Sequence, residues 1–518
     1  MRLVLVCPFI LALALSSALA APPDWARDAV IYQVLVDRFH DGDPSNNHAG
    51  EDQPLPPSQN PGYRPTVNFL GGDLAGIRQK LPYLADLGVN CLWLTPVFRT
   101  PFYHGYHVMD YDKVEPRFGT ESDLRKLVDE AHAKGIRVLL DYVANHASEY
   151  HPAFQDALKS RESRFHDWFL WKSWPKEYER FYYFPDLPRW NTGSREVREM
   201  LMSAAVGWIR KYGVDGLRLD FAVGPGKQFW QELSGRLGAD RYLLGEVWED
   251  APVIGSWADA LHGCMDFPRQ AVFNQFFAQK SIDVDSFDRS MNDLRRIYGP
   301  MAMGSFLGNH DVPRFLESAG NDVWRLYVAA IAQMTFDEVP IVYYGDEVTS
   351  HTGSVASGGA AGGGSGQINH EASDQETRKR MPWDDAQDGE LRALFRTLIH
   401  LRRELAPLRR GGMTTVWRHN DRGQYGYRRS LGDDHVLVLL NNKADASEAP
   451  LPVPAGGQWR ELLGNRLLTA SDGNVRVRVP GNWGAILVPE SPRARELGER
   501  TVIPAAVRRA LQYSRLEQ

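Results

Sequence analysis

Cysteine is nearly absent from this chain, which has three cysteines in 518 residues. Cys7 lies in an apolar N-terminal stretch, and Cys91 and Cys264 stand within runs typical of buried strands. A scaffold held together by disulfides needs many more cysteines, so that class of protein is excluded. We expect Cys91 and Cys264 to be two buried thiols rather than a bridge.

An excess of either charge and long apolar runs are also missing. The net charge is -6 with 24% charged residues, which gives no reason to expect a nucleic acid as partner. Residues 1–20 contain Arg2, an apolar stretch and small residues at Ala18 and Ala20, the pattern of a signal peptide. A buried first helix is the alternative. The sequence therefore predicts a secreted or periplasmic protein, with no membrane partner once the signal is removed.

Strand-like apolar runs alternate with amphipathic stretches over most of the chain, which is the pattern of repeated β–α units and a parallel sheet. Eight parallel strands close a (β/α)8 TIM barrel, whose functional residues lie at the C-terminal ends of the strands. The sequence predicts such a barrel, of fold class α/β, from residues 21–146 and 196–408. The eight predicted strands begin at Ala29, Asn90, Ile136, Gly216, Tyr242, Gly263, Gly304 and Pro340.

Three further segments depart from the barrel pattern. Residues 147–195, rich in aromatic side chains, are too long for an ordinary loop after the third strand and predict a small inserted domain. Residues 409–490 contain short alternating runs that favour a C-terminal antiparallel β-sandwich. Residues 491–518 are charged and helix-prone, and we assign them no role. The glycine-rich segment 354–367 is expected to be a solvated loop.

Carboxyl groups end or directly follow several predicted strands, where a TIM barrel places its chemistry: Asp141, Asp220, Glu246 and Asp311. Cleavage of a glycosidic bond requires one protonated carboxyl group and one ionised carboxylate. Arg218 lies two residues before Asp220 on the same strand face and would favour the charged form of a nucleophile. Apolar neighbours would raise the pKa of Glu246, as a general acid requires. Each strand end alone could equally be a structural ion pair.

Four motifs occur in a fixed order: DYVANH from Asp141, GLRLD from Gly216, GEVW from Gly245 and FLGNHD from Phe306. Together they resemble the signature regions of the α-amylase family of glycoside hydrolases. GVNCLWLTP and VPIVYYGDE resemble its second-strand and eighth-strand motifs. The resemblance covers most of residues 24–350. It implies the TIM barrel and the retaining hydrolysis of α-1,4-glucosidic bonds.

The same resemblance implies roles for individual residues. Asp220 would be the nucleophile, Glu246 the general acid and base, and Asp311 the carboxylate that stabilises the transition state. Arg218 would orient Asp220. The residues that would bind the sugar in the cleaved subsite are His146, His310, Tyr106 and, beside it, His104.

The motif DGDPSNN, followed by GGD from Gly71, contains several oxygen ligands within turns. Alone, this pattern is often only a polar turn. It resembles the N-terminal calcium loop of cyclodextrin glucanotransferases, which implies a structural Ca2+ held by Asp41, Asp43, Asn46, Asn47, Gly71 and Asp73. A second calcium site with Asn145 and Asp186 has less support. Its usual ligand is the carbonyl of a histidine in a Lys-His pair, and this chain has Val223 and Gly224 there.

The sequence leaves the substrate open among starch-derived α-glucans and maltooligosaccharides. The loss of the Lys-His pair and the motif MDFP favour a cyclomaltodextrinase or neopullulanase, whereas the missing N-terminal β-domain opposes that choice. A transglycosylase would use the same intermediate. An inactive carbohydrate-binding or assembly protein is opposed by the presence of all three carboxylates. The oligomeric state is not indicated.

Overall fold

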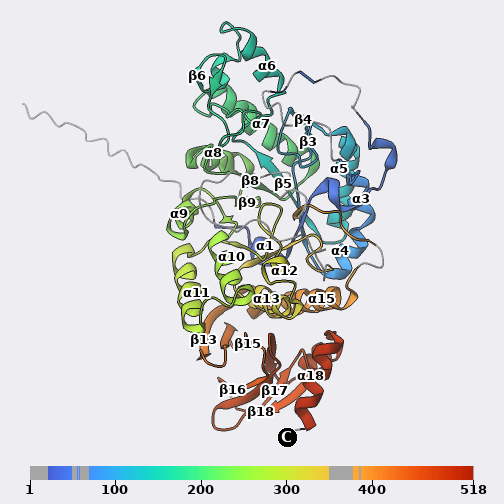
Figure 1. Cartoon of the computed structure of the whole chain (residues 1–518), viewed down its shortest axis with the longest axis vertical. Coiled ribbons are helices and arrows are strands. Elements are labelled where there is room, and N and C mark those ends of the chain that lie inside the picture. The colour runs from blue at the N-terminus through green and yellow to red at the C-terminus, as the bar shows by residue number, and fades with distance from the viewer. Residues whose placement is uncertain are drawn as a thin grey trace, which may run out of the picture.

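The computed structural model describes residues 21–49, 55, 56, 58, 69–348, 377–383, 387–454 and 456–516. The predicted signal peptide and the glycine-rich segment therefore lie outside the described residues. Within the described ranges, no helix is both long and apolar enough to cross a membrane. Figure 1 shows an elongated molecule with the insertion at one end and the C-terminal sheet at the other.

The central sheet has eight parallel strands in the order β10-β9-β8-β5-β2-β1-β12-β11. A parallel bridge between Met265 and Gly304 joins the two outer strands, so the sheet closes into the predicted TIM barrel. Each strand overlaps one of the eight runs identified in the sequence, although β5 extends past the end of its run and β12 begins one residue before Pro340. They are β1 (Ile31–Val34), β2 (Cys91–Leu94), β5 (Arg137–Val143), β8 (Gly216–Asp220), β9 (Tyr242–Gly245), β10 (Gly263–Cys264), β11 (Gly304–Phe306) and β12 (Val339–Tyr343).

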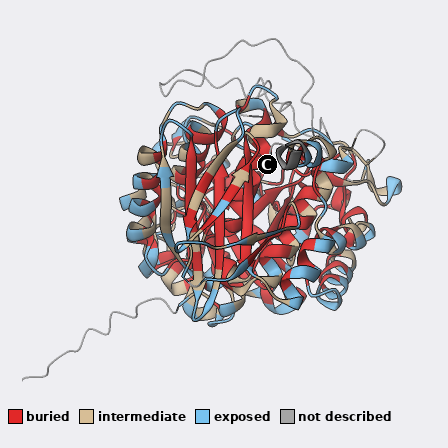
Figure 2. Ribbon diagram, turned by 90° about the horizontal axis from the view of Figure 1, so that it is seen from below, coloured by how far each residue is buried: buried red, intermediate tan, exposed pale blue. Residues whose placement is uncertain are grey.

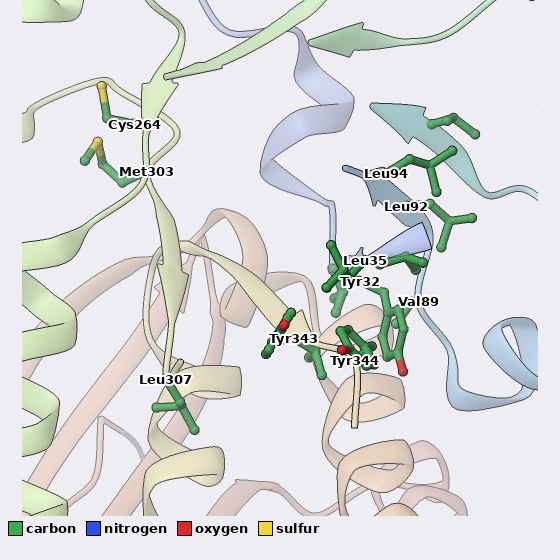
Figure 3. Close-up of a cluster of buried hydrophobic side chains, with 14 of the residues drawn as sticks. Tyr32, Leu35, Val89, Leu92, Leu94, Cys264, Met303, Leu307, Tyr343 and Tyr344 are labelled. Carbon is green, nitrogen blue, oxygen red and sulfur yellow. The ribbon is translucent and has the colours of Figure 1, made fainter. Parts of the chain in front are cut away.

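Helices surround the barrel. Figure 2, seen from the side of the C-terminal sheet, shows buried strands in the middle of the molecule and helices at the sides with exposed outer faces. The strand residues alternate between two apolar clusters, as the two-residue period of a strand requires. Ile31, Trp93 and Leu139 belong to the cluster inside the barrel. Tyr32 and Leu92 belong to the larger cluster between strands and helices, part of which is drawn in Figure 3. Cys91 and Cys264 are buried and free, as predicted.

The barrel helices follow the strands in chain order, and short elements precede or interrupt them. One short helix, α1 (Asp24–Arg27), precedes β1. Between β1 and β2 lie α2 (Val36–Phe39), η1 (Pro44–Asn46), α3 (Leu74–Gln79) and α4 (Leu81–Leu87). After β2 come β3 (Phe98–Arg99), β4 (Asp110–Val114), η2 (Pro116–Phe118) and α5 (Glu121–Ala133). The insertion is followed by α7 (Arg195–Tyr212), β8 by α8 (Lys227–Leu237), and β9 by α9 (Ala251–Gly255) and η4 (Ser256–Asp259). After β10 come α10 (Phe267–Phe273), η5 (Asn274–Ala278) and α11 (Val284–Tyr298). After β11 come α12 (Phe315–Ser318) and α13 (Val323–Thr335), and after β12 come α15 (Gly389–Glu404) and α16 (Ala406–Arg410).

Between β5 and α7 the chain forms the insertion, which rises from the barrel as seen in Figure 1. Its elements are α6 (Pro152–Lys159), η3 (His166–Trp168) and the small antiparallel sheet of β6 (Trp171–Ser173) and β7 (Glu177–Tyr178). Its aromatic rings pack on one another, with Phe154 against Phe169 and Tyr178 at 4.9 Å between ring centroids. The aromatic composition thus provides a small core of its own.

The C-terminal region contains a six-stranded and a two-stranded antiparallel sheet. The larger sheet consists of β13 (Gly412–His419), β14 (Gln424–Leu431), β15 (Asp434–Asn441), β20 (Trp483–Pro489), β17 (Gln458–Glu461) and β18 (Arg466–Thr469). The smaller sheet pairs β16 (Ser447–Pro452) with β19 (Asn474–Val479). One apolar cluster contains residues of both sheets, including Leu437, Leu451, Val477 and Leu487. This arrangement agrees with the antiparallel domain predicted from the alternating runs.

The charged C-terminal tail forms α17 (Pro492–Arg500) and α18 (Ala505–Leu516). Arg500 Nη2 lies 3.1 Å from Glu404 Oε1 at the end of α15, and Thr397 Oγ1 donates to the Val502 carbonyl at 3.0 Å. α17 also contacts β17. The tail therefore joins the barrel to the C-terminal sheet.

Candidate active site

Arg218 lies at the centre of a cluster of carboxyl groups at the C-terminal ends of the strands. The register of β5 and β8 places Arg218 beside Asp141. Its Nη1 lies 2.9 Å from Asp141 Oδ1 and 3.0 Å from Asp220 Oδ1, and its Nη2 lies 2.8 Å from Glu246 Oε1. The guanidinium is fully buried, so these three carboxyl groups neutralise a charge that burial would otherwise make costly. One arginine thus holds both members of the predicted catalytic pair.

Burial raises the pKa of both Asp220 and Glu246, and for Asp220 the nearby charge of Glu246 raises it further. The direction for Glu246 agrees with the sequence-based expectation. For Asp220 it does not, because Arg218 divides its charge among three carboxyl groups and cannot alone keep Asp220 ionised. Two neighbouring carboxyl groups in such a site retain one proton between them and titrate as a pair. Asp220 Oδ2 has no hydrogen-bond partner among the described residues.

Asp311 has a different environment. His310 Nε2 lies 2.9 Å from Asp311 Oδ2, and Arg378 Nη2 lies 3.1 Å from Asp311 Oδ1. Although burial alone would raise the pKa of Asp311, the charges of His310, Arg378 and Arg218 hold it well below its usual range. Asp311 is therefore an ionised carboxylate beside a pair that carries a proton.

Tyr106 stacks on His310, with ring centroids 5.4 Å apart and planes inclined by 3°. The Tyr106 hydroxyl donates to Asp141 Oδ2 at 2.8 Å and lies 2.8 Å from His310 Nε2. The Tyr106 amide donates to His104 Nδ1 at 3.2 Å. His146 Nε2 contacts the Tyr106 carbonyl at 3.2 Å, and burial lowers the pKa of His146 to about 3. The predicted sugar-binding residues are thus brought together, with His146 neutral.

Exposed aromatic rings occur in the insertion and directly after Glu246. Tyr182 and Tyr183 of the insertion are 63% and 53% exposed, and Trp248, two residues after Glu246, is 50% exposed. Trp248 stacks on Phe267 with ring centroids 4.4 Å apart. Flat apolar faces open to solvent beside carboxyl groups suit a ligand with both apolar and hydroxyl surfaces.

The second predicted cation site is only partly assembled. Asn145 Oδ1 is buried and has no hydrogen-bond partner among the described residues. The carbonyl of Gly224 accepts a hydrogen bond from Arg189 Nη2 at 3.2 Å, which places a positive charge where a second cation would need a free ligand. Asp186 lies 3.8 Å from His107. A Cβ on Gly224 would lie 1.9 Å from Asn145 Oδ1, so this backbone leaves no room for the histidine of the Lys-His pair.

The loop from Asp41 to Asn47 folds against Gly71 and Asp73. Asp73 accepts hydrogen bonds from the amides of Gly76, Gly42 and Asp43 and from the side chain of Asn46, which fixes the loop on α3. Three buried oxygens in this loop have no hydrogen-bond partner among the described residues: Asp41 Oδ1, Asn46 Oδ1 and Asn47 Oδ1. Within the described ranges, no three His, Cys, Asp or Glu side chains form a cation-binding group.

Sequence reasoning missed two contributors to the site. Arg378 follows the segment after β12 and reaches back to Asp311, a contact that no local motif indicates. Phe221 donates its amide to Glu246 Oε2 at 2.9 Å, a main-chain contact that side-chain identities do not reveal. Arg218 also contacts Glu246, a cationic neighbour that the residues beside Glu246 in the sequence do not reveal.

Comparison with known proteins identifies the family of the chain. Residues 33–393 match the α-amylase catalytic domain, and residues 414–482 match the C-terminal domain of maltogenic amylase. The chain is 36% identical to a cyclomaltodextrinase from Geobacillus thermopakistaniensis (strain MAS1) over 458 residues, covering 84% of this chain and 72% of the relative. It is 34% identical to neopullulanase 2 from Thermoactinomyces vulgaris, covering 90% and 78%. A solved cyclomaltodextrinase structure superposes with a TM-score of 0.77 at 31% identity, covering 90% of this chain and 79% of that one.

Proposed function

Because the chain belongs to the α-amylase family of glycoside hydrolases, we propose that it cleaves α-1,4-glucosidic bonds of starch-derived glucans by double displacement at Asp220. The observation that carries the proposal is the contact of one guanidinium with both Asp220 and Glu246. It keeps the nucleophile and the acid on neighbouring strands within reach of one bond. The presence of Asp311 in the same cluster opposes an inactive binding protein.

In the first step, Asp220 Oδ2 attacks the anomeric carbon while the bond to the leaving glucosyl oxygen breaks. Glu246 gives its proton to that oxygen, and the product is a glucosyl ester of Asp220. In the second step, Glu246 takes a proton from water, the resulting hydroxide attacks the same carbon, and the Asp220 carboxylate is released. Two inversions retain the α configuration. Asp311 stays ionised throughout and stabilises the positive charge that develops on the sugar ring.

Soluble starch and maltotriose test this function directly. The wild-type protein should release reducing sugar, and proton NMR should show the α anomer as the first product. Asp220→Asn and Glu246→Gln should each lose at least roughly a thousandfold in kcat, because each removes half of the displacement. Glu249→Gln, an exposed neighbour, is the matched control and should keep its rate. A β anomer, or full activity in either variant, would reject the proposal.

Within this family we propose a preference for short or cyclic maltooligosaccharides over long chains. Val223 and Gly224 remove the cationic contact of a Lys-His pair, and the close approach of Asn145 to Gly224 leaves no room to restore it. The names of the relatives, cyclomaltodextrinase and neopullulanase, agree with this choice. Equal concentrations of α-cyclodextrin and amylose should be compared. Rapid internal cleavage of amylose with untouched cyclodextrin would indicate an endo-acting amylase instead.

We further propose that Ca2+ binds the Asp41 loop as a structural ion. The three unpartnered oxygens of Asp41, Asn46 and Asn47 are ligands of the kind that calcium prefers. Asp43 belongs to the same loop, and Gly71 lies against Asn47 and Asp41. Gly71 has φ +87°, and a Cβ there would lie 2.7 Å from Asn47 Oδ1, so the glycine leaves space for this oxygen cage. Asp73 holds the loop by accepting hydrogen bonds from main-chain amides such as that of Asp43. The ion would tie the loop to the start of α3, outside the acidic pair.

The N-terminal composition supports a proposal of export, in which residues 1–20 are removed after Ala20. N-terminal sequencing of the protein purified from the periplasm or medium of an expressing bacterium should begin at Ala21. A protein that retains Met1 and stays in the cytoplasm would contradict export.

A further inference from the structure

The residue directly after the nucleophile has an unusual backbone. Phe221 has φ +38°, in the left-handed region that bulky side chains rarely adopt. Such a conformation persists only where the surrounding structure holds it, and it commonly marks a functional position. The chain continues in a tight turn, closed by a hydrogen bond from the Gly224 amide to the Phe221 carbonyl at 2.9 Å.

The turn presents two successive main-chain amides to the acid–base residue. Phe221 N donates to Glu246 Oε2 at 2.9 Å, and the next amide, of Ala222, donates to the Glu246 carbonyl at 2.9 Å. The turn after β8 therefore contacts both the side chain and the main chain of Glu246. The Phe221 amide lies in the peptide plane that follows Asp220, whereas φ of Phe221 sets where its ring and the next peptide lie. The left-handed φ therefore accompanies a turn in which the Ala222 amide returns to Glu246 and the ring faces the insertion.

The ring of Phe221 is held from the opposite side by the insertion. Its centroid lies 4.9 Å from that of Phe181 and 5.5 Å from that of Tyr182, both in edge-on geometry. Phe181 in turn stacks on His146 at 4.9 Å. Tyr182 is itself left-handed, with φ +48°. Aromatic contacts of this kind stabilise a ring position beyond simple burial, so they can offset the strain at Phe221.

We propose that Phe221 is a positioning residue for Glu246, whose ring, wedged against Phe181 and Tyr182, keeps its amide on the acid–base carboxyl group. The insertion thereby influences the protonation of Glu246 without contacting the reacting atoms. This inference rests on the proposed role of Glu246 as acid and base.

The direction of the effect follows from the hydrogen bond. An amide that donates to a carboxylate stabilises the ionised form, so it opposes the burial that raises the pKa of Glu246. Loss of that bond raises the pKa, and Glu246 then keeps its proton to higher pH. The charged and titratable groups that face Glu246 are Arg218 and Asp220 from β8, His310 and Asp311 after β11, and Tyr182 from the insertion. Removing the Phe221 ring leaves all of these residues in place, and of them only Tyr182 loses a ring contact.

The test is the pH profile of kcat on maltotriose for wild type, Phe221→Gly and Phe221→Tyr. The Phe221→Gly variant accepts the left-handed backbone but lacks the aromatic ring. The basic limb of its kcat–pH profile should therefore move to higher pH by about one unit, which is the scale of one hydrogen bond to a charged group. Tyrosine keeps the ring and should keep the limb in place. Phe165→Gly, which removes a half-buried ring of the insertion packed on Trp168, is the matched control. Phe221→Asn, also tolerant of left-handed backbone, replaces the glycine variant if that one fails to fold.

The outcomes separate two claims. A shifted limb in Phe221→Gly or Phe221→Asn, with unshifted tyrosine and control variants, supports the inference. If Glu246→Gln is inactive and the limb of the glycine variant coincides with wild type, the inference on Phe221 is overturned while the proposed function stands. If Glu246→Gln retains ordinary turnover, the proposed role of Glu246 fails, and the inference fails with it.

Discussion

Arg378 Nη2 lies 3.1 Å from Asp311 Oδ1, across 67 residues of sequence. The Arg378 Nε also donates to the His310 carbonyl at 2.9 Å, so the same guanidinium holds both residues of the motif. This contact connects the segment after β12 to the carboxylate that we assign to transition-state stabilisation. It also supplies positive charge that helps keep Asp311 ionised.

Replacement of Arg378 by Gln should lower kcat/KM at least roughly tenfold, since one charge-assisted hydrogen bond of about 1.5 kcal/mol or more is lost. Arg378→Lys should recover part of the rate. Arg380→Gln, two residues on, removes a contact to the Leu70 carbonyl and is the control. Equal kcat/KM in Arg378→Gln and Arg380→Gln would show that Arg378 does not act on Asp311.

A second prediction concerns the shared proton of the acidic pair. After burial, the charge of Glu246 is the next cause that raises the pKa of Asp220, so Glu246→Gln should lower that pKa. α-Maltosyl fluoride has a leaving group that needs little protonation, so it allows residual turnover to be followed. Its acidic limb, which reports ionisation of Asp220, should move to lower pH by roughly one unit. An acidic limb that stays in place would mean that the two carboxyl groups titrate independently.

A third prediction concerns calcium. An ion bound only to the folded protein stabilises it by about 2.7 kcal/mol when the free ion is a hundred times its dissociation constant. EDTA should therefore lower the melting temperature of wild type by several degrees and leave kcat at 25 °C nearly unchanged. Asp41→Ala should abolish the EDTA effect, whereas Asp112→Ala, an exposed acid elsewhere, should preserve it. A wild-type melting temperature that EDTA leaves unchanged would exclude the ion. A shift that persists in Asp41→Ala would place it elsewhere.

A fourth prediction follows from the space around Gly224. Because a Cβ would lie 1.9 Å from Asn145 Oδ1, Gly224→His should destabilise the protein and reduce activity instead of producing an endo-acting amylase. Val223→Lys meets no such obstacle, since Val223 is half-buried, and should be tolerated. Thermal melts and product profiles on amylose check both variants. A stable Gly224→His enzyme that releases long intermediates would contradict this reading of the loop.

The sequence predicted the barrel well because the strands are short, mostly apolar runs, and some end at a polar residue, as β8 does at Asp220. Parallel strands align their C-terminal ends, so the order of motifs also predicted which carboxyl groups meet. What remained hidden depends on backbone conformation or on long-range contact. A phenylalanine gives no signal of the left-handed φ at Phe221, and no motif indicates that Arg378 contacts Asp311.

The C-terminal tail gives a similar lesson. Its helical tendency is visible in the sequence, but its position is set by partners far away, such as Glu404 of α15. Charged side chains on an exposed helix have many possible partners, so pattern alone could not choose among them. The second cation site also required the structure, because the guanidinium of Arg189 on the Gly224 carbonyl cannot be inferred from spacing.

Covalent trapping tests the central claim, that Asp220 forms an ester with the substrate, most directly. Glu246→Gln should be incubated with α-maltosyl fluoride, quenched in acid, digested and analysed by mass spectrometry. The second step needs Glu246 as base, so the intermediate should accumulate. We predict a maltosyl adduct on the peptide that contains Asp220, absent from Asp220→Asn treated in the same way. An adduct on another residue, or turnover to a β product with no adduct, would contradict the account.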